Sequence, residues 1–284
     1  MRKALFVTIV IAAIFLLAMI TSVATASWRL TLSHKNPMKF VETKFHTELG
    51  ENSVKPLAGN KWAVIIGIAD YQGRDSDLWH PDEDAKEMYS ELTRQQMYPK
   101  ANVKLLTNKG ATAAAIVNAI NWLIANEKPG HEGVFFYSGH GYRAPDGDGW
   151  DGDVESDGYD EMIVTYDFYG LPDGWFKQKF AAIESTKFAL MFGSCYSGGM
   201  FDDDDDLQGT GRIIASACKA DQYGWDYLQL GNTLWGYYFV DRGLLDNNAN
   251  SIEAAHAYAY PRVVAEQPDS QPQLYDNYPS DFLL

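Results

Sequence analysis

The stretch Gly133-Val-Phe-Phe-Tyr-Ser-Gly-His-Gly141 begins as an unbroken apolar run and ends in small residues around a histidine. The stretch Phe188-Ala-Leu-Met-Phe-Gly-Ser-Cys-Tyr-Ser-Gly-Gly199 repeats this order, with a cysteine where the first has its histidine. Short apolar runs bounded by glycine are typical of strands that are buried on both faces. Each stretch therefore predicts a buried strand with one reactive side chain just beyond its carboxyl end.

Similar apolar runs recur along the chain, and helix-like stretches separate them. Strands are predicted at 62–68, 102–106, 133–137, 188–192 and 212–216, and helices near 82–96, 112–126, 176–183, 233–244 and 252–260. This alternation predicts an α/β fold with a mostly parallel sheet and helices on both faces. Because active sites of such sheets lie at the carboxyl ends of the strands, we expect His140 and Cys195 to share one crevice.

A thiol beside an imidazole is a nucleophile beside its base. The imidazole helps to form the thiolate and later protonates the leaving amine. Nearby glycines let backbone N–H groups approach a developing oxyanion. Alone, His140 reads as a structural histidine and Cys195 as a buried apolar residue, and a Cys195–Cys218 disulfide is a further alternative. The matched position of both motifs at strand ends favours catalysis.

The composition bounds the class of protein. Apolar residues make up 46% of the 284, which is enough for a full-sized core and excludes general disorder. The formal net charge of −15 predicts no binding to nucleic acid and favours cations or basic peptides as partners. Solubility alone is the simpler explanation of this charge.

The N-terminus reads as an export signal. Arg2 and Lys3 precede an uncharged, mostly apolar run at 4–23, and Ala24-Thr-Ala26 matches a small-residue cleavage site. The run is also long enough to span a bilayer, so a retained anchor is the alternative, and membrane contact is expected only through 4–23 if it stays uncleaved. We expect a secreted or otherwise extracytoplasmic protein.

The chain therefore divides into three expected parts. Residues 1–26 form the signal peptide or anchor, residues 27–59 a connector, and residues 60–284 one domain.

The two motif stretches resemble the signature blocks of caspase-like cysteine peptidases, especially metacaspases. The strings AVIIGIADY, DEDAKEM, DGYDEMIVTYDF and SACKADQYGWD resemble further blocks of that family and cover most of residues 61–226. The resemblance implies a caspase-like α/β sandwich and hydrolysis of peptide bonds by a His140/Cys195 dyad, with the backbone N–H groups of Gly141 and Cys195 as the oxyanion hole. A peptide or protein is then the expected substrate.

The resemblance also implies a substrate pocket, with one departure. Metacaspases usually carry an acidic residue two places before the nucleophile, where this chain has Gly193. Asp84 matches a second acidic pocket position, and Asp226, the last residue of the SACKADQYGWD block, is assigned to the same pocket. Cleavage after Arg or Lys is the resulting hypothesis. The aspartates at 202–206 are either a substitute for the missing acid or a solvated loop.

Eight carboxylates with interspersed glycines lie between Asp146 and Glu161. Calcium takes six to eight oxygen ligands on flexible backbone, so this segment predicts a calcium site with Asp153, Asp157 and Asp160 among the ligands. Calcium dependence of many metacaspases supports the same expectation. The alternative is an acidic loop without a specific ion. No organic cofactor is expected.

Three other classes fit less well. An α/β-hydrolase with a cysteine nucleophile requires a Gly-x-Cys-x-Gly elbow and a later histidine, whereas this chain has Ser197 at the second glycine position. An inactive, calcium-ordered caspase-like binding module would be expected to lack the histidine or the cysteine. Legumain-like and gingipain-like peptidases share the two motifs but differ in specificity, and the DGYDE string favours the metacaspase side.

Overall fold

The computed structural model describes residues 27–29, 39–40, 59–146, 155–203, 206–246 and 249–284. The expected signal peptide or anchor and most of the connector lie outside these residues, as does Asp153. Among the described residues, no helix has both the length and the apolar character needed to cross a bilayer.

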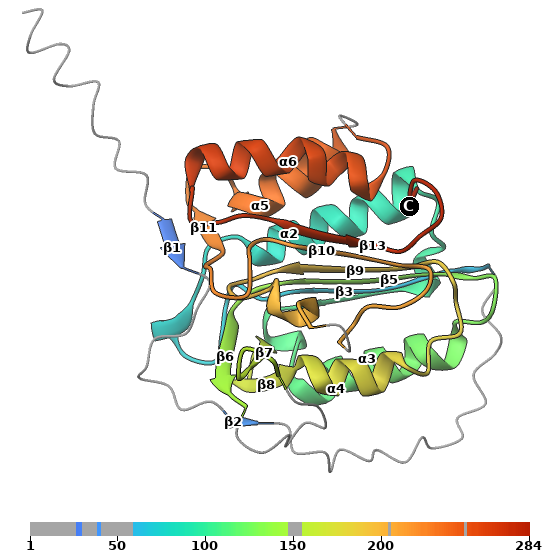
Figure 1. Cartoon of the computed structure of the whole chain (residues 1–284), viewed down its shortest axis with the longest axis horizontal. Coiled ribbons are helices and arrows are strands. Elements are labelled where there is room, and N and C mark those ends of the chain that lie inside the picture. The colour runs from blue at the N-terminus through green and yellow to red at the C-terminus, as the bar shows by residue number, and fades with distance from the viewer. Residues whose placement is uncertain (1–26, 30–38, 41–58, 147–154, 204–205, 247–248) are drawn as a thin grey trace, which may run out of the picture.

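A six-stranded sheet forms the centre of the domain (Figure 1), in the order β13-β10-β9-β5-β3-β4. Its strands are β3 (Lys61–Gly67), β4 (Val103–Thr107), β5 (Glu132–Ser138), β9 (Phe188–Gly193), β10 (Arg212–Ser216) and β13 (Gln273–Asp276). All neighbours pair in parallel except β13, which is antiparallel to β10. The five strands predicted from apolar runs are confirmed, whereas the short, half-polar edge strand β13 was not predicted.

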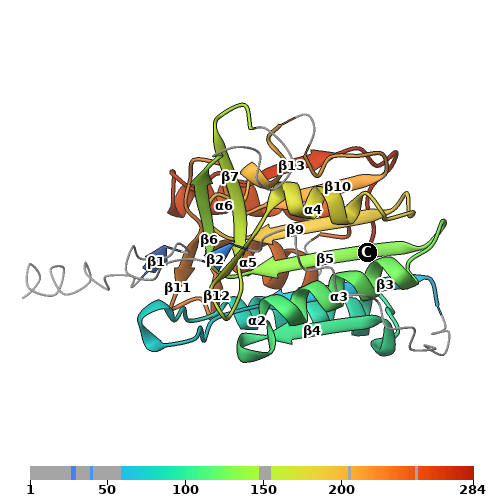
Figure 2. The same cartoon turned by 90° about the horizontal axis from the view of Figure 1, so that it is seen from below.

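Helices cover both faces of this sheet (Figures 1 and 2). One face carries α2 (Pro81–Ser90), α5 (Leu234–Gly236) and α6 (Ile252–Glu266), with π-helical turns at Glu91–Gln95 and Tyr237–Leu245. The other face carries α3 (Ala113–Asn126) and α4 (Asp173–Phe180). Short 3₁₀ turns lie at Arg74–Ser76, Lys100–Asn102, Asn108–Gly110 and Gly199–Phe201. The predicted α/β class with a mostly parallel sheet is confirmed.

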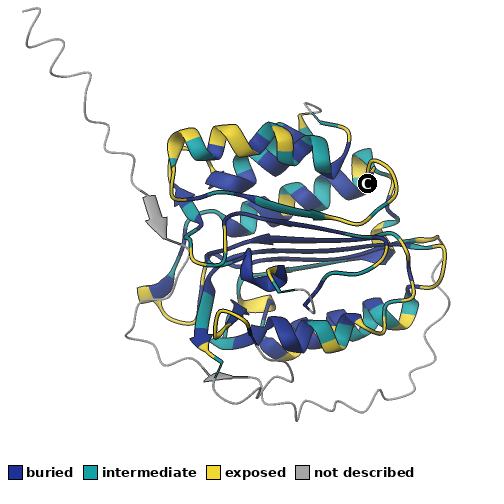
Figure 3. Cartoon of the chain, viewed as in Figure 1, coloured by how far each residue is buried: buried dark blue, intermediate teal, exposed yellow. Residues whose placement is uncertain are grey.

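The strand residues supply two cores because successive side chains point to opposite faces. In β5, Phe135 packs with the α3 and α4 layer, and Phe136 packs with the α2, α5 and α6 layer. The ring of Phe135 lies 5.3 Å from that of Phe176 in α4. Figure 3 shows the central strands as the most continuously buried part of the chain. Burial on both faces explains why these strands read as unbroken apolar runs.

Two small sheets lie beside the carboxyl ends of the central strands. One contains β6 (Gly141–Pro145), β7 (Tyr159–Val164), β8 (Tyr169–Pro172) and β2 (Lys39–Phe40), in the order β2-β8-β7-β6. The other contains β1 (Ser27–Arg29), β11 (Trp225–Tyr227) and β12 (Asn232–Thr233), in the order β1-β11-β12. The segment expected to be a plain connector thus contributes two short strands, β1 and β2.

Candidate active site

The register of β5 and β9 brings the histidine and the cysteine motifs together. Ser138 is paired with Gly193, so His140 and Cys195 each lie two residues beyond the same rung of the parallel ladder. The N–H of Gly139 donates to the carbonyl oxygen of Gly193 at 3.2 Å, which continues the pairing past the strand ends. The two side chains predicted to share one crevice therefore emerge next to each other at one edge of the sheet.

His140 is held by groups that lie outside the two motifs. It is 3% exposed, and its Nε2 atom lies 2.7 Å from the carbonyl oxygen of Ser76. Because a carbonyl only accepts hydrogen bonds, Nε2 carries the proton and Nδ1 is the basic nitrogen. The backbone N–H of His140 donates to the hydroxyl of Tyr71 at 2.7 Å, and the two rings lie 4.7 Å apart. The imidazole is thus fixed in one tautomer and one orientation.

Cys195 begins a sharp turn after β9. The residue is 1% exposed, and its thiol lies 3.5 Å from the carbonyl oxygen of Gly224, just before β11. The next residue, Tyr196, has a φ of 58°, which is the left-handed region that side chains other than glycine rarely adopt. Its N–H donates to the carbonyl oxygen of Gln222 at 2.9 Å, and this contact holds the turn. The turn redirects the chain immediately after the nucleophile candidate.

Cys218 is not bonded to Cys195, because both are free thiols. Its sulfur lies 3.7 Å from the hydroxyl of Ser197 and is fully buried. Burial raises the pKa of the Cys218 thiol to about 11, so little reactive thiolate forms at neutral pH. The disulfide alternative is therefore not formed, and Cys195 is the cysteine that lies beside a histidine.

Gly141 is a position where no side chain fits. A Cβ atom built on it would overlap the carbonyl oxygen of Cys195. Its backbone therefore approaches the nucleophile turn closely, as an oxyanion donor must. Alanine keeps the N–H, but its methyl would push this backbone away from the Cys195 turn, so we expect Gly141→Ala to lower kcat/KM by about 100-fold or more, the usual cost of losing an oxyanion donor.

The measurement is steady-state kinetics on a peptide substrate, with thermal melting to verify that the variant folds. Gly130→Ala is the control, because a Cβ there meets nothing within 4 Å, although its φ of 81° adds some strain. Equal activity of Gly141→Ala and the wild type would remove Gly141 from the site.

Asp84 lies in α2 behind the paired Ser138 and is completely buried. Its carboxylate accepts from the hydroxyls of Ser138 and Thr233, each at 2.7 Å. It also accepts from the Thr233 N–H and the Asn232 amide, each at 3.1 Å. Burial outweighs these bonds and raises the pKa of Asp84 to about 7. The structure thus places Asp84 next to the strand ends, where its carboxylate accepts four hydrogen bonds from the chain itself.

Asp226 on β11 is the second predicted pocket acid, and it lies near Asp84. One oxygen, Oδ2, accepts from the backbone N–H groups of Trp79 at 2.5 Å and His80 at 3.3 Å, just before α2. The other, Oδ1, is buried and has no hydrogen-bond partner among the described residues. Burial raises the pKa of Asp226 to about 7, and its charge contributes to the raised pKa of Asp84. The two buried carboxylates thus lie close enough to act on each other.

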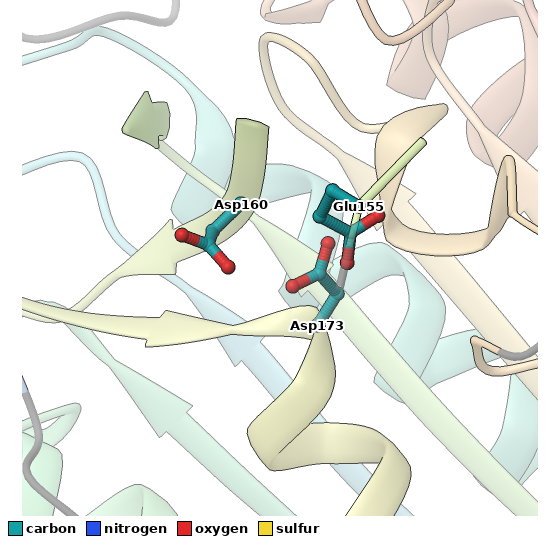
Figure 4. Close-up of side chains that lie close together, drawn as sticks. All are labelled: Glu155, Asp160 and Asp173. Atoms are coloured by element: carbon teal, nitrogen blue, oxygen red, sulfur yellow. The ribbon is translucent and has the colours of Figure 1, made fainter. Parts of the chain in front are cut away.

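A separate cluster of buried carboxylates contains Glu155, Asp160 and Asp173. Glu155, Asp160 and Asp173 are 7%, 0% and 0% exposed, and each offers an oxygen within 4.8 Å of the others (Figure 4). Burial and the charges of Glu155 and Glu161 raise the pKa of Asp173 far above its usual range. Hard oxygen ligands at this density fit calcium. Of the predicted ligands, Asp160 belongs to this cluster, whereas Asp157 is exposed and accepts from the Tyr159 N–H at 2.9 Å.

Glu161 lies next to this cluster and is also a buried acid. It is 1% exposed, and within the described part of the chain neither carboxylate oxygen has a hydrogen-bond partner. Burial, then the charges of Asp202 and Asp157, raise its pKa to about 10. A Cβ on Gly199, in the turn after Cys195, would overlap its carboxylate. The Glu161 carboxylate therefore lies against the turn that follows Cys195.

Several of these residues carried no clear signal in the sequence. Asp173 follows a proline at the start of a helix, where an aspartate usually reads as a helix-capping residue. Ser76 acts through its backbone carbonyl, which no side-chain pattern reveals. Tyr71 lies in the AVIIGIADY block and was quoted there without a role.

Comparisons with known proteins agree with this geometry. The Metacaspase-1A proteins of Aspergillus oryzae and Aspergillus terreus are 34% and 33% identical to the chain over 155 residues, which is 51% of it. The match spans 36% and 37% of those two relatives. A crystal structure of a Geobacter sulfurreducens protein superposes on 79% of the chain and 97% of its own length, with a TM-score of 0.61 at 19% identity. That likeness shows the fold alone.

A family model for the metacaspase peptidase C14 domain matches residues 61–204, the segment that contains Asp84, His140, Gly141 and Cys195. The chain belongs to the metacaspase peptidase C14 family.

Proposed function

We propose that the protein is a cysteine endopeptidase in which Cys195 attacks the peptide bond and His140 is its base. The observation that carries the proposal is the strand register that puts both residues two positions beyond one rung of the sheet. Because the match spans only about a third of the curated relatives, peptidase activity of the whole protein is part of the proposal.

The steps follow from the geometry of the site. Nδ1 of His140 takes the thiol proton while Nε2 stays bound to the Ser76 carbonyl. The thiolate attacks the carbonyl carbon, and the backbone N–H groups of Gly141 and Cys195 stabilise the oxyanion. The imidazolium then protonates the leaving amine, and water hydrolyses the thioester. Incubating the purified chain with a fluorogenic peptide library tests this, and no turnover of any peptide, with or without calcium, would reject it.

We further propose cleavage after Arg or Lys. Two carboxylates support it: Asp84 accepts from Ser138 at the strand ends, and Oδ1 of Asp226 has no hydrogen-bond partner among the described residues. Negative charge there attracts a basic side chain and repels an aspartate. Gly193 supplies no carboxylate, so the preference depends on these two residues. A cleavage profile dominated by acidic or apolar residues would reject basic specificity without rejecting the peptidase.

We propose that calcium assists the enzyme through Glu155, Asp160 and Asp173. Three buried carboxylates within 4.8 Å of one another repel unless they are protonated or share a cation. A bound calcium ion would neutralise them and link β7 to the start of α4. Since Glu161 lies against Gly199, the same charge balance acts on the turn that follows Cys195.

We expect calcium to raise the melting temperature of the wild type, because binding to the folded state stabilises it by mass action. Asp173→Asn removes one buried ligand and should abolish most of this shift. Asp157→Asn is the matched control, since Asp157 is exposed and lies outside the cluster. Calorimetric titration gives the binding directly. No heat and an unchanged melting temperature in the wild type would contradict the proposal.

Export is also proposed, and it depends on residues 1–26. N-terminal sequencing of the protein from the producing cell distinguishes the two forms. A start at Ser27 indicates a cleaved signal peptide, and a retained N-terminus in the membrane fraction indicates an anchor.

A further inference from the structure

Trp235 lies where a side chain at position 193 would project. A Cβ built on Gly193 would lie 3.3 and 3.4 Å from Cε3 and Cζ3 of the Trp235 indole, and 3.2 Å from the hydroxyl of Ser138. Any larger side chain would have to extend further into this space. The edge of the indole therefore fills the volume into which a residue at 193 would project.

Trp235 is fixed in this place from several sides. It is 2% exposed, and its ring stacks on Phe239 at 4.5 Å with an interplanar angle of 15°. On the sheet, Phe136 lies 6.4 Å from it in a stacked arrangement. Two residues earlier, Thr233 caps α5 and binds Asp84 through both its N–H and its hydroxyl. The same turn thus positions the indole edge against Gly193 and holds the pocket acid.

One polar atom in this apolar packing has no partner. The Nε1 atom of Trp235 is buried and, among the described residues, its N–H donates no hydrogen bond. A buried donor without an acceptor costs free energy, which offsets part of what the wider indole gains by packing.

We infer that Trp235 is the specificity-determining residue of this chain, because its indole edge occupies the space that an acidic side chain at position 193 would need. The inference rests on the proposed peptidase function and identifies one residue that lines its substrate pocket. It follows that the proposed pocket presents the indole edge at position 193, with Asp84 bonded to the neighbouring Ser138. A basic substrate side chain then depends on Asp84 and Asp226 for its charge partners, and Gly193 and Trp235 form a matched pair that must change together.

The experiment compares two peptides that differ only before the scissile bond, one with Arg and one with norleucine. The ratio of their kcat/KM values is measured for the wild type, Gly193→Asp, Trp235→Phe and the double variant. Because both peptides meet the same enzyme preparation, a change in the amount of folded protein cancels from the ratio. A residue that only stabilises the fold would leave this ratio unchanged.

Gly193→Asp alone is expected to lose at least tenfold in kcat/KM on both peptides, since its carboxylate meets the indole. Combined with Trp235→Phe, the carboxylate gains room, and the Arg-to-norleucine ratio should exceed the wild-type ratio by tenfold or more. Leu244→Ala is the control, because it loosens the same apolar cluster without lying against Gly193. It should leave the ratio at the wild-type value.

Three outcomes would overturn the inference. An active double variant with the wild-type ratio would show that Trp235 only packs, and would leave the peptidase proposal intact. Absence of turnover in every folded form, wild type included, would overturn both proposals. If the double variant does not fold, Gly193→Ala is melted with and without Trp235→Phe. An equal loss in melting temperature in both backgrounds would mean that the two positions do not interact.

Discussion

Alanine in place of Cys195 is expected to lower peptide hydrolysis by about 10⁴-fold or more, to the level left by binding and the oxyanion donors. The thiol is the only group at this position able to form the covalent intermediate. The side chain is 1% exposed and its thiol lies 3.5 Å from the Gly224 carbonyl oxygen. Alanine removes only the sulfur atom, so the fold should stay intact. Single-turnover assays measure the rate of hydrolysis, and thermal melting of the same sample measures the stability of the fold.

His140→Ala should lower the rate by a similar factor, because it removes the base and the proton donor for the leaving amine. The losses should not add in the double variant, since both residues act in one proton transfer. Cys218→Ala is the matched control: this thiol is also buried and free, but it has no histidine assigned to it. Normal turnover by Cys195→Ala or His140→Ala, or a total loss in Cys218→Ala, would contradict the assignment.

The central sheet and the juxtaposition of His140 and Cys195 were predictable because their signals are local. Burial on both faces makes β3, β5 and β9 read as apolar runs, and parallel alternation with helices places their carboxyl ends together. Once Ser138 and Gly193 are paired, the positions of His140 and Cys195 follow from the length of each motif. The fixed spacing of each motif therefore predicts where its reactive side chain lies in the fold.

The acidic cluster was only partly predictable, because its members meet through tertiary structure. Asp160 lies in β7 and Asp173 starts α4 after the hairpin with β8, so pairing of short, mixed strands brings them together. The charge-rich segment pointed to the region and to Asp160, but spacing along the chain favoured Asp157 over Asp173. Neither β7 nor β8 has an apolar run long enough to reveal the pairing.

The proposed substrate pocket was predictable only in part for the same reason, as position 193 shows. The sequence shows that position 193 lacks a carboxylate, but not what fills the space. Trp235 lies 42 residues later, in a stretch whose apolar spacing indicates only a buried helix. Its contact with Gly193 depends on how α5 lies over the sheet. Such a contact is a property of the packed layers, not of either segment.

Asp84→Asn is expected to change the pH dependence of stability more than any exposed substitution. In the folded protein burial raises the pKa of Asp84 to about 7, against an ordinary value of 3.8. Below about pH 4 the carboxyl is protonated in both states and costs nothing. As the pH rises from about 4 to 7 the unfolded chain loses this proton while the folded protein keeps it, so stability falls. Above pH 7 the loss is constant, at about 4 kcal/mol.

Asparagine does not titrate and has nearly the same shape, so Asp84→Asn should remove this loss. The variant should match or fall below the wild type at pH 4 and exceed it at pH 8, as measured by urea unfolding at both values. Asp75→Asn, in the exposed turn before α2, is the control and should leave the difference in stability between the two pH values unchanged.

The same Asp84→Asn protein should lose cleavage after Arg while retaining the Cys195 chemistry, because the carboxylate is the group proposed to attract the basic side chain. One result would contradict the stability prediction: wild-type stability that rises between pH 4 and 7 and that Asp84→Asn leaves unchanged. It would mean that the buried carboxylate is charged over this whole range and is stabilised by its four hydrogen bonds from Ser138, Asn232 and Thr233.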